Sequence, residues 1–144
     1  MKNAILTGLT VREHHMQEMQ AHVHQNLPEE ACGLLAASNG TSQAVFPITN
    51  TLHSPVKFFM DPFELLQALQ TLDERGWELQ AVFHSHPAGP SVPSETDLRE
   101  YLLPEVPALI WHRRQPEFEP AGWICDAFLI KPDKYQPLAL HLIA

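Results

Sequence analysis

The sequence predicts a mixed α/β (α+β) domain in which two or three helices wrap a single central mixed β-sheet. Short apolar runs of strand length recur along the chain, and longer segments between them carry helix-start and helix-stop signals. Of the 144 residues, 44% are hydrophobic and 18% are charged, so the chain can bury a core. We therefore expect residues 1–144 to form one domain.

The predicted strands are apolar or alternating runs bounded by turn residues. They cover, in chain order, residues 3–9, 31–37, 43–48, 56–60, 78–84, 108–111, 123–130 and 135–143. The sequence Ser38-Asn39-Gly40 predicts a turn after the second of these strands. The pattern does not give the order of the strands in the sheet.

The first predicted helix runs from a cap at Thr10 to about Asn26. Its apolar side is expected to carry Val11, Met16, Met19 and Val23. Four of the nine histidines fall in this helix: His14, His15, His22 and His24. Because they are scattered over several faces, we expect them to be exposed to solvent rather than to bind a metal.

The second predicted helix begins with Asp61 as the N-cap and Pro62 at the first helical position. It continues to about Arg75, where Gly76 ends it. The side chains expected to be buried are Phe63, Leu66, Leu69 and Leu72. A third, short helix opens at Ser94 and ends before Pro104.

The charge balance excludes some classes of function. Nine basic and seventeen acidic side chains give a net charge of −8, which argues against nucleic-acid binding. No apolar run approaches the twenty or so residues that span a bilayer, and the N-terminal region lacks the apolar centre of a secretory signal. We expect a cytoplasmic protein in which Cys32 and Cys125 are free, buried thiols.

The segment of residues 81–97, AVFHSHPAGPSVPSETD, combines metal-ligand residue types. His84 and His86 are two apart at a strand end, so both imidazoles should project from one face, with Cα atoms roughly 6.5 Å apart. Ser94 and Asp97 are three apart on the following helix and share a face. Two histidines, one carboxylate and an open fourth position are typical of catalytic zinc.

Each half of this pattern has a structural interpretation when it is taken alone. Ser94-x-x-Asp97 is close to an ordinary capping box, and two histidines at a strand end are often only polar surface residues. The intervening Pro/Gly-rich loop should fold the helix start back over the strand end. The two halves together therefore favour a metal site.

Two motifs resemble the signature of the JAMM (MPN-plus) metallopeptidases, in its minimal prokaryotic form. His84-Ser85-His86-Pro87 is followed, after the loop that ends at Pro93, by Ser94-x-x-Asp97 with no departure in spacing. The second motif lies upstream in residues 28–35, PEEACGLL, where the family glutamate two residues before Cys-Gly matches Glu30.

The resemblance implies a JAMM/MPN-like (cytidine deaminase-like) fold, with the metal site at strand ends. His84, His86 and Asp97 would bind one Zn²⁺, with a water as fourth ligand. Glu30 would act as general base and Ser94 would hydrogen-bond the oxyanion. The bond cleaved would follow the C-terminal Gly-Gly of a ubiquitin-like protein, such as a sulfur carrier, or of its conjugate.

Two other functions remain open on the sequence. The chain could hydrolyse small peptides or amides without a protein partner, or it could be a zinc-binding scaffold module without catalysis. Cys32, two residues beyond Glu30, is favoured as a packing residue. The roles of His53 and His112, the oligomeric state and the identity of the substrate are not predicted.

Overall fold

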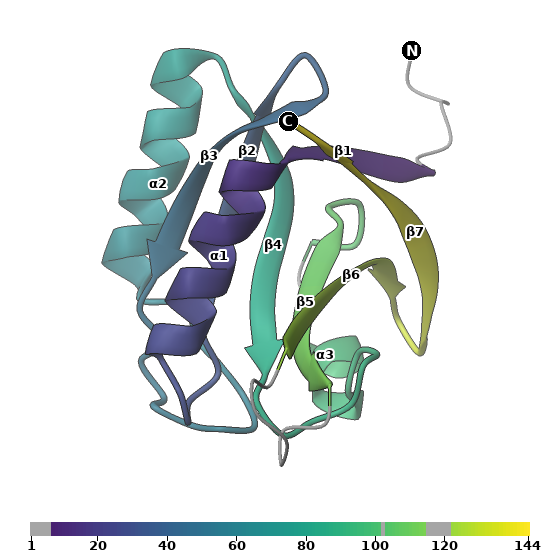
Figure 1. Cartoon of the computed structure of the whole chain (residues 1–144). Coiled ribbons are helices and arrows are strands. Elements are labelled where there is room, and N and C mark those ends of the chain that lie inside the picture. Colours follow the sequence, from purple (N-terminus) through teal and green to yellow (C-terminus); the bar gives the residue numbers. More distant parts are fainter. Residues whose placement is uncertain (1–6, 102, 115–121) are drawn as a thin grey trace.

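The computed structural model describes residues 7–101, 103–114 and 122–144. In these residues the chain forms seven strands and three helices (Figure 1). They are β1 (Gly8–Arg12), α1 (Glu13–Gln25), β2 (Cys32–Ser38), β3 (Thr41–Ile48), α2 (Pro62–Arg75), β4 (Glu78–His86), α3 (Glu95–Glu100), β5 (Ala108–Arg114), β6 (Gly122–Lys131) and β7 (Lys134–Ile143).

The strands form one mixed sheet in the order β1-β3-β2-β4-β5-β6-β7, as the predicted fold class requires. Strand β1 also pairs with β7, so the sheet closes into a barrel, which the sequence did not predict. The pairs β1–β3, β1–β7 and β4–β5 are parallel, and the other pairs are antiparallel.

The two faces of the sheet have different helical partners. On the inner face, Met19 and Val23 of α1 join a buried cluster that includes Leu35, Phe83 and Leu109. On the outer face, α2 packs through a second buried cluster, whose members are Cys32, Leu34, Ile48, Ala68 and Val82. Because side chains alternate along a strand, His84 and His86 lie on the same face as Val82. The candidate site is therefore on the outer face, which α2 and α3 flank (Figure 1).

Most predicted elements are confirmed with shifts of one to three residues at their ends. The turn between β2 and β3 places Asn39 and Gly40 at φ angles of 52° and 80°, as a tight hairpin requires. Ser94 opens α3, but this helix ends at Glu100 rather than before Pro104. Cys32 and Cys125 are free thiols; Cys32 is completely buried as expected, whereas Cys125 is only half-buried. No helix in the described parts of the chain is long and apolar enough to cross a membrane.

The N-terminal boundary was predicted wrongly. Residues 3–6 of the predicted first strand lie outside the described residues, and β1 continues to Arg12. Thr10 is therefore in a strand and does not cap the helix; the N-cap is Arg12, which makes no side-chain capping bond. Thr10 pairs with His141 of β7, and the neighbours of Thr10 in β1 pair with β7 as well. This strand pairing outweighs the local preference of Thr10 for a capping position.

The expectation of solvent exposure fails for one helical histidine. His14 and His24 are exposed and His22 is half-buried, but only 4% of His15 is exposed. Nδ1 of His15 lies 2.6 Å from the Ser42 hydroxyl at the start of β3, a partner that the helical sequence alone cannot supply.

The predicted strand at residues 56–60 is a loop, apart from one isolated bridge between Asn50 and Met60. The buried side chain of Asn50 donates to the carbonyl oxygen of Lys57 at 3.1 Å and accepts from the backbone N–H of Leu52 and of Phe59 at 3.0 and 3.1 Å. The side-chain amide of Asn50 thus hydrogen-bonds backbone groups that would otherwise pair with a neighbouring strand.

Helix α2 has the predicted ends but the wrong buried face. Asp61 accepts from the backbone N–H groups of Phe63 and Glu64 at 2.9 and 3.0 Å, and Gly76 at φ 68° ends the helix. Of the four side chains expected to be buried, Leu72 is buried, whereas Phe63, Leu66 and Leu69 are 67%, 53% and 39% exposed. The helix contacts the sheet through the narrower side that carries Ala68 and Leu72. Three large apolar side chains therefore remain at the surface.

Candidate active site

Three ligating atoms converge where β4 ends. Nε2 of His84 lies 3.1 Å from Nε2 of His86, and the two nitrogens are 3.2 and 3.0 Å from Oδ2 of Asp97. All three side chains are buried, with at most 9% of each residue exposed. The strand end supplies both imidazoles and the start of α3 supplies the carboxylate, as the sequence pattern predicted.

This triangle fits a small tetrahedral metal ion. Ligands about 2.0–2.1 Å from a tetrahedral centre are separated by about 3.3 Å, close to the three separations observed. Two imidazole nitrogens and a carboxylate oxygen are also a donor set that Zn²⁺ prefers. The three residues therefore fit a metal ion, and within the described residues they leave a further coordination position free of protein ligands.

The turn after β4 fixes the orientation of His86. Its Nδ1–H donates to the carbonyl oxygen of Pro90 at 2.7 Å, which leaves the Nε2 lone pair directed at the other ligating atoms. Gly89 lies against the same ring, and a Cβ at this position would come within 3.1 Å of the His86 Cβ. The Pro/Gly-rich loop thus sets the tautomer required of a metal ligand.

A capping box holds Asp97. The Asp97 backbone N–H donates to the Ser94 hydroxyl at 3.1 Å, and the Ser94 backbone N–H donates to Asp97 Oδ2 at 2.9 Å. Burial alone would raise the pKa of Asp97, but its close contacts with His84 and His86 and the hydrogen bond from the Ser94 backbone outweigh burial and hold that pKa well below its usual range. The capping role of Asp97 is therefore compatible with metal binding by the same carboxylate.

Glu30 reaches the site through the pairing of β2 with β4. Cys32 is opposite His84, and the Ser85 backbone N–H donates to the carbonyl oxygen of Ala31 at 3.0 Å. Continuing this antiparallel register by one residue places Glu30 opposite His86. Glu30 and His86, 56 positions apart in the sequence, are thus neighbours, although no local pattern shows it.

The carboxyl group of Glu30 is buried and incompletely hydrogen-bonded. Only 4% of the residue is exposed, and its Oε1 has no hydrogen-bond partner in the described part of the chain. Burial raises the pKa of Glu30 to about 8, which the nearby His86 opposes and Asp97 reinforces. The metal-free protein therefore holds a proton on Glu30 at neutral pH.

Ser94 borders the same site. Its oxygen accepts the capping bond from Asp97, so its hydroxyl proton is still available to another acceptor. The serine is partly exposed, unlike the ligating side chains. It can therefore cap α3 and donate to a substrate at the same time.

Three supporting residues were missed by the sequence analysis. Ser85, completely buried between the two histidines, accepts from the Ala31 N–H at 2.8 Å and joins β4 to β2. Asn50 donates to the Glu30 carbonyl oxygen at 3.0 Å, and Phe58 stacks on the His84 ring with centroids 4.7 Å apart. The sequence could have indicated a structural role for Ser85, because it is a small polar residue inside an apolar strand. No sequence pattern indicated the roles of Asn50 and Phe58.

The residues left open by the sequence have ordinary partners. The Cys32 thiol donates to the Ile48 carbonyl oxygen at 3.5 Å, consistent with a packing role. His112 Nε2 lies 2.8 Å from Asp126 Oδ2. His53 Nδ1 lies 3.2 Å from Glu29 Oε1 at the surface. None of the three is grouped with the ligating atoms of the candidate site.

The fold and the site define a protein with a His-His-Asp group that could hold a metal ion where β4 ends and α3 begins. The chain belongs to the family of prokaryotic homologues of the JAB domain, whose family model matches residues 12–125. The resemblance to the JAMM metallopeptidases is therefore confirmed.

Relatives with named activities cover part of the chain. A "Probable TtuB-protein conjugate cleaving protease" of Thermus thermophilus is 38% identical over 59% of this chain and 57% of its own length. A desampylase of Pyrococcus furiosus is 44% identical over 48% of this chain and 49% of its own length. A CysO-cysteine peptidase of Mycobacterium tuberculosis is 29% identical over 75% of each chain. The matches to the first two relatives thus span about half of their length.

Solved structures agree with the fold. A protein from Desulfitobacterium hafniense is 36% identical, with a TM-score of 0.80 over 94% of this chain and 92% of its own. A JAB1/MPN domain protein from Archaeoglobus fulgidus has a TM-score of 0.59 at 17% identity, over 94% of this chain and 98% of its own. The second likeness supports the fold alone, and both agree with the predicted fold class.

Proposed function

We propose that this chain is a zinc metallopeptidase that hydrolyses the amide bond after the C-terminal Gly-Gly of a ubiquitin-like, sulfur-carrier-type protein or of its conjugate. Relatives named for cleaving TtuB conjugates and CysO-cysteine support this class of substrate. A cytoplasmic location is part of the proposal, because both cysteines are free thiols.

One observation carries the proposal. Three ligating atoms lie within 3.2 Å of one another beside a buried glutamate that is not itself one of them. A structural zinc site is usually closed by four protein ligands, whereas this one offers three protein ligands and a proton-carrying carboxyl group. The arrangement is typical of a hydrolytic centre.

Glu30 would carry the proton. When bound, Zn²⁺ supplies Lewis acidity that lowers the pKa of water to about 7. Burial raises the pKa of Glu30 and a neighbouring cation lowers it, so its carboxylate can accept a proton from the attacking water near neutral pH. The same group then returns the proton to the leaving amine, which cannot depart unprotonated.

Ser94 would stabilise the developing negative charge. Its hydroxyl proton is not used by the capping box, so it can donate to the substrate oxygen. A single donor of this kind is worth roughly 3 kcal/mol of barrier in other hydrolases. The backbone bonds of the capping box hold the serine in place before substrate binds.

The exposed apolar side chains near the site would hold the carrier. We define the apolar patch as Leu52, Val56, Phe59, Phe63, Leu66 and Leu69, which are 39–71% exposed. They lie on the loop before α2 and on the first two turns of that helix. Since Phe58 of this loop stacks on His84, the part of the patch on the loop lies beside the candidate metal site. A folded carrier docked here would place its C-terminal tail near Glu30.

Cleavage of a carrier fused through its Gly-Gly tail to a reporter tests the proposal. The zinc-loaded chain should cut the fusion, and Glu30→Gln should bind zinc as before but lose at least about 10²-fold in kcat. Full activity of Glu30→Gln would refute the assigned base, and zinc binding without any cleavage of carrier fusions would favour a scaffold module.

Short peptides separate carrier processing from general peptide hydrolysis. If the patch docks the carrier, Phe63→Ser should raise KM for the folded fusion and leave cleavage of a short Gly-Gly peptide unchanged. Gln67→Ser, on an exposed part of the same helix, is the matched control. Equal kcat/KM for peptide and folded fusion, unaffected by Phe63→Ser, would favour a small-peptide hydrolase.

A further inference from the structure

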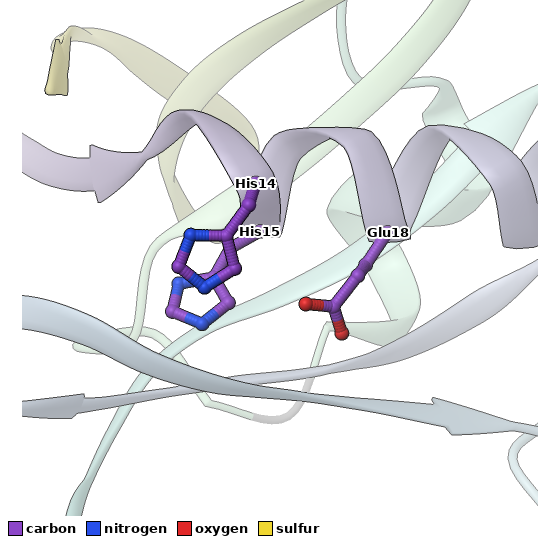
Figure 2. A group of neighbouring side chains, drawn as sticks. All are labelled: His14, His15 and Glu18. Atoms are coloured by element: carbon purple, nitrogen blue, oxygen red, sulfur yellow. The ribbon is translucent and has the colours of Figure 1, made fainter. Parts of the chain in front are cut away.

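A second group of metal-ligating side chains lies at the start of α1. One ring nitrogen each of His14 and His15 and a carboxylate oxygen of Glu18 lie within 4.8 Å of one another. Glu18 is one helical turn from both histidines, and Figure 2 shows its carboxylate pointing toward the two neighbouring rings. The ring centroids are 4.1 Å apart.

This cluster is separate from the candidate active site. His15 contacts Ser42, which pairs with Ala37 towards the end of β2, whereas His84 pairs with Cys32 at the start of that strand. Five residues of extended strand correspond to roughly 17 Å. A metal ion at the cluster would therefore not share ligands with the ion proposed at His84.

His15 is already oriented as a ligand. Its Nδ1 lies 2.6 Å from the Ser42 hydroxyl, which is itself held by the Arg12 backbone N–H at 2.8 Å. If Nδ1 donates to Ser42, Nε2 carries the lone pair, which is the tautomer that a second hydrogen bond imposes on metal-binding histidines.

The other two ligands can move. His14 and Glu18 are exposed, so small rotamer changes can shorten separations of up to 4.8 Å to the 3.3 Å or so that a tetrahedral ion requires. Burial and the neighbouring His14 lower the pKa of His15, which keeps its ring neutral, as a metal ligand must be.

The electrostatics of the surroundings are mixed but permit a cation. The start of a helix carries partial positive charge, which opposes a cation there. Arg12 also lies nearby, but its guanidinium is directed to the backbone oxygen of Ala144 at 3.2 Å. The carboxylates of Glu13 and Glu18 offset both effects.

We propose that His14, His15 and Glu18 form a second zinc site at the start of α1, which binds Zn²⁺ through two imidazoles and one carboxylate. The buried His15–Ser42 contact would fix one ligand of the ion, and the other two ligands, His14 and Glu18, are exposed to solvent. Water would complete its coordination.

The Zn²⁺ content of the dialysed full-length chain tests the proposal. We expect about two ions per chain in the native protein and about one in Glu18→Gln and in His14→Ala. Both changes are at exposed positions and should leave the fold intact. His24→Ala and Glu74→Gln remove the same groups from exposed positions of α1 and α2 that the site does not use, and both should retain two ions.

Imidazole NMR identifies the ligands independently. Once the candidate active site is filled, further Zn²⁺ should shift the ring resonances of His14 and His15 together. The shift should be complete when one more equivalent has been added. The proposal is overturned if native and Glu18→Gln chains bind the same number of ions, or if the His15 ring resonances do not change.

Discussion

Replacing Glu30 by Gln in the metal-free protein tests whether burial controls its ionisation. Burial raises the pKa of Glu30 from 4.5 to about 8, so the folded state holds the proton more tightly than the unfolded state. The stability that the protonated Glu30 contributes is therefore fully present below pH 4.5 and is lost as the pH rises towards 8. Gln has nearly the same shape and stays neutral, so it escapes this loss.

The size of the effect follows from the shift in pKa. At 1.36 kcal/mol per pH unit, the change from 4.5 to about 8 corresponds to about 5 kcal/mol, of which about 4 kcal/mol falls between pH 5 and pH 9. Relaxation around a buried charge reduces such values. We therefore expect the free energy of unfolding of Glu30→Gln, relative to the native chain, to increase by about 2–4 kcal/mol between these pH values.

Urea unfolding in the presence of a chelator, followed by circular dichroism at pH 5 and pH 9, measures this difference. The other titrating groups are common to both chains and largely cancel. Glu13→Gln, which removes an exposed carboxylate of α1, controls for the loss of one charge. If the difference between native and Glu30→Gln chains is the same within about 0.5 kcal/mol at the two pH values, the reasoning from burial is wrong.

Three further substitutions test the surroundings of the site. Ser94→Ala should lower kcat about 10²-fold with the zinc content unchanged, and a native kcat would exclude Ser94 as an oxyanion donor. Ser85→Ala leaves the buried N–H of Ala31 unpaired and should cost about 1–3 kcal/mol in urea unfolding; a loss below about 0.5 kcal/mol would contradict that hydrogen bond. Asp61→Ala removes the N-cap of α2, which makes no bond to the ligating side chains, and should cost about 1 kcal/mol, with kcat unchanged on a short peptide.

The parts of the site that the sequence predicted are those set by local geometry. His84 and His86 share a face because side chains alternate along a strand, and Ser94 and Asp97 because helical neighbours are three residues apart. The Pro/Gly-rich loop closes the short distance between the two elements. The contacts of His84 and His86 with Asp97 therefore lie within one short segment of the chain.

Other features depend on contacts between distant parts of the chain. Glu30 faces His86 only because β2 and β4 pair in one register, which a single sequence does not specify. The barrel closes only because β1 pairs with β7, which is more than a hundred residues away in the sequence. The buried side of α2 could not be predicted for the same reason, since its apolar residues occupy more than one face and the sheet selects Ala68 and Leu72.

The burial of Glu30 connects folding, metal binding and catalysis. Without a metal, a carboxyl group whose Oε1 has no partner destabilises the fold once it ionises, and Asn50 holds its backbone in that position. A cation at His84, His86 and Asp97 would favour the ionised form and offset this cost. Zinc should therefore stabilise the native chain more than Glu30→Gln at pH 9, and nearly equally at pH 5. The same buried charge that weakens the metal-free protein would then be the group that accepts a proton in the metal-bound one.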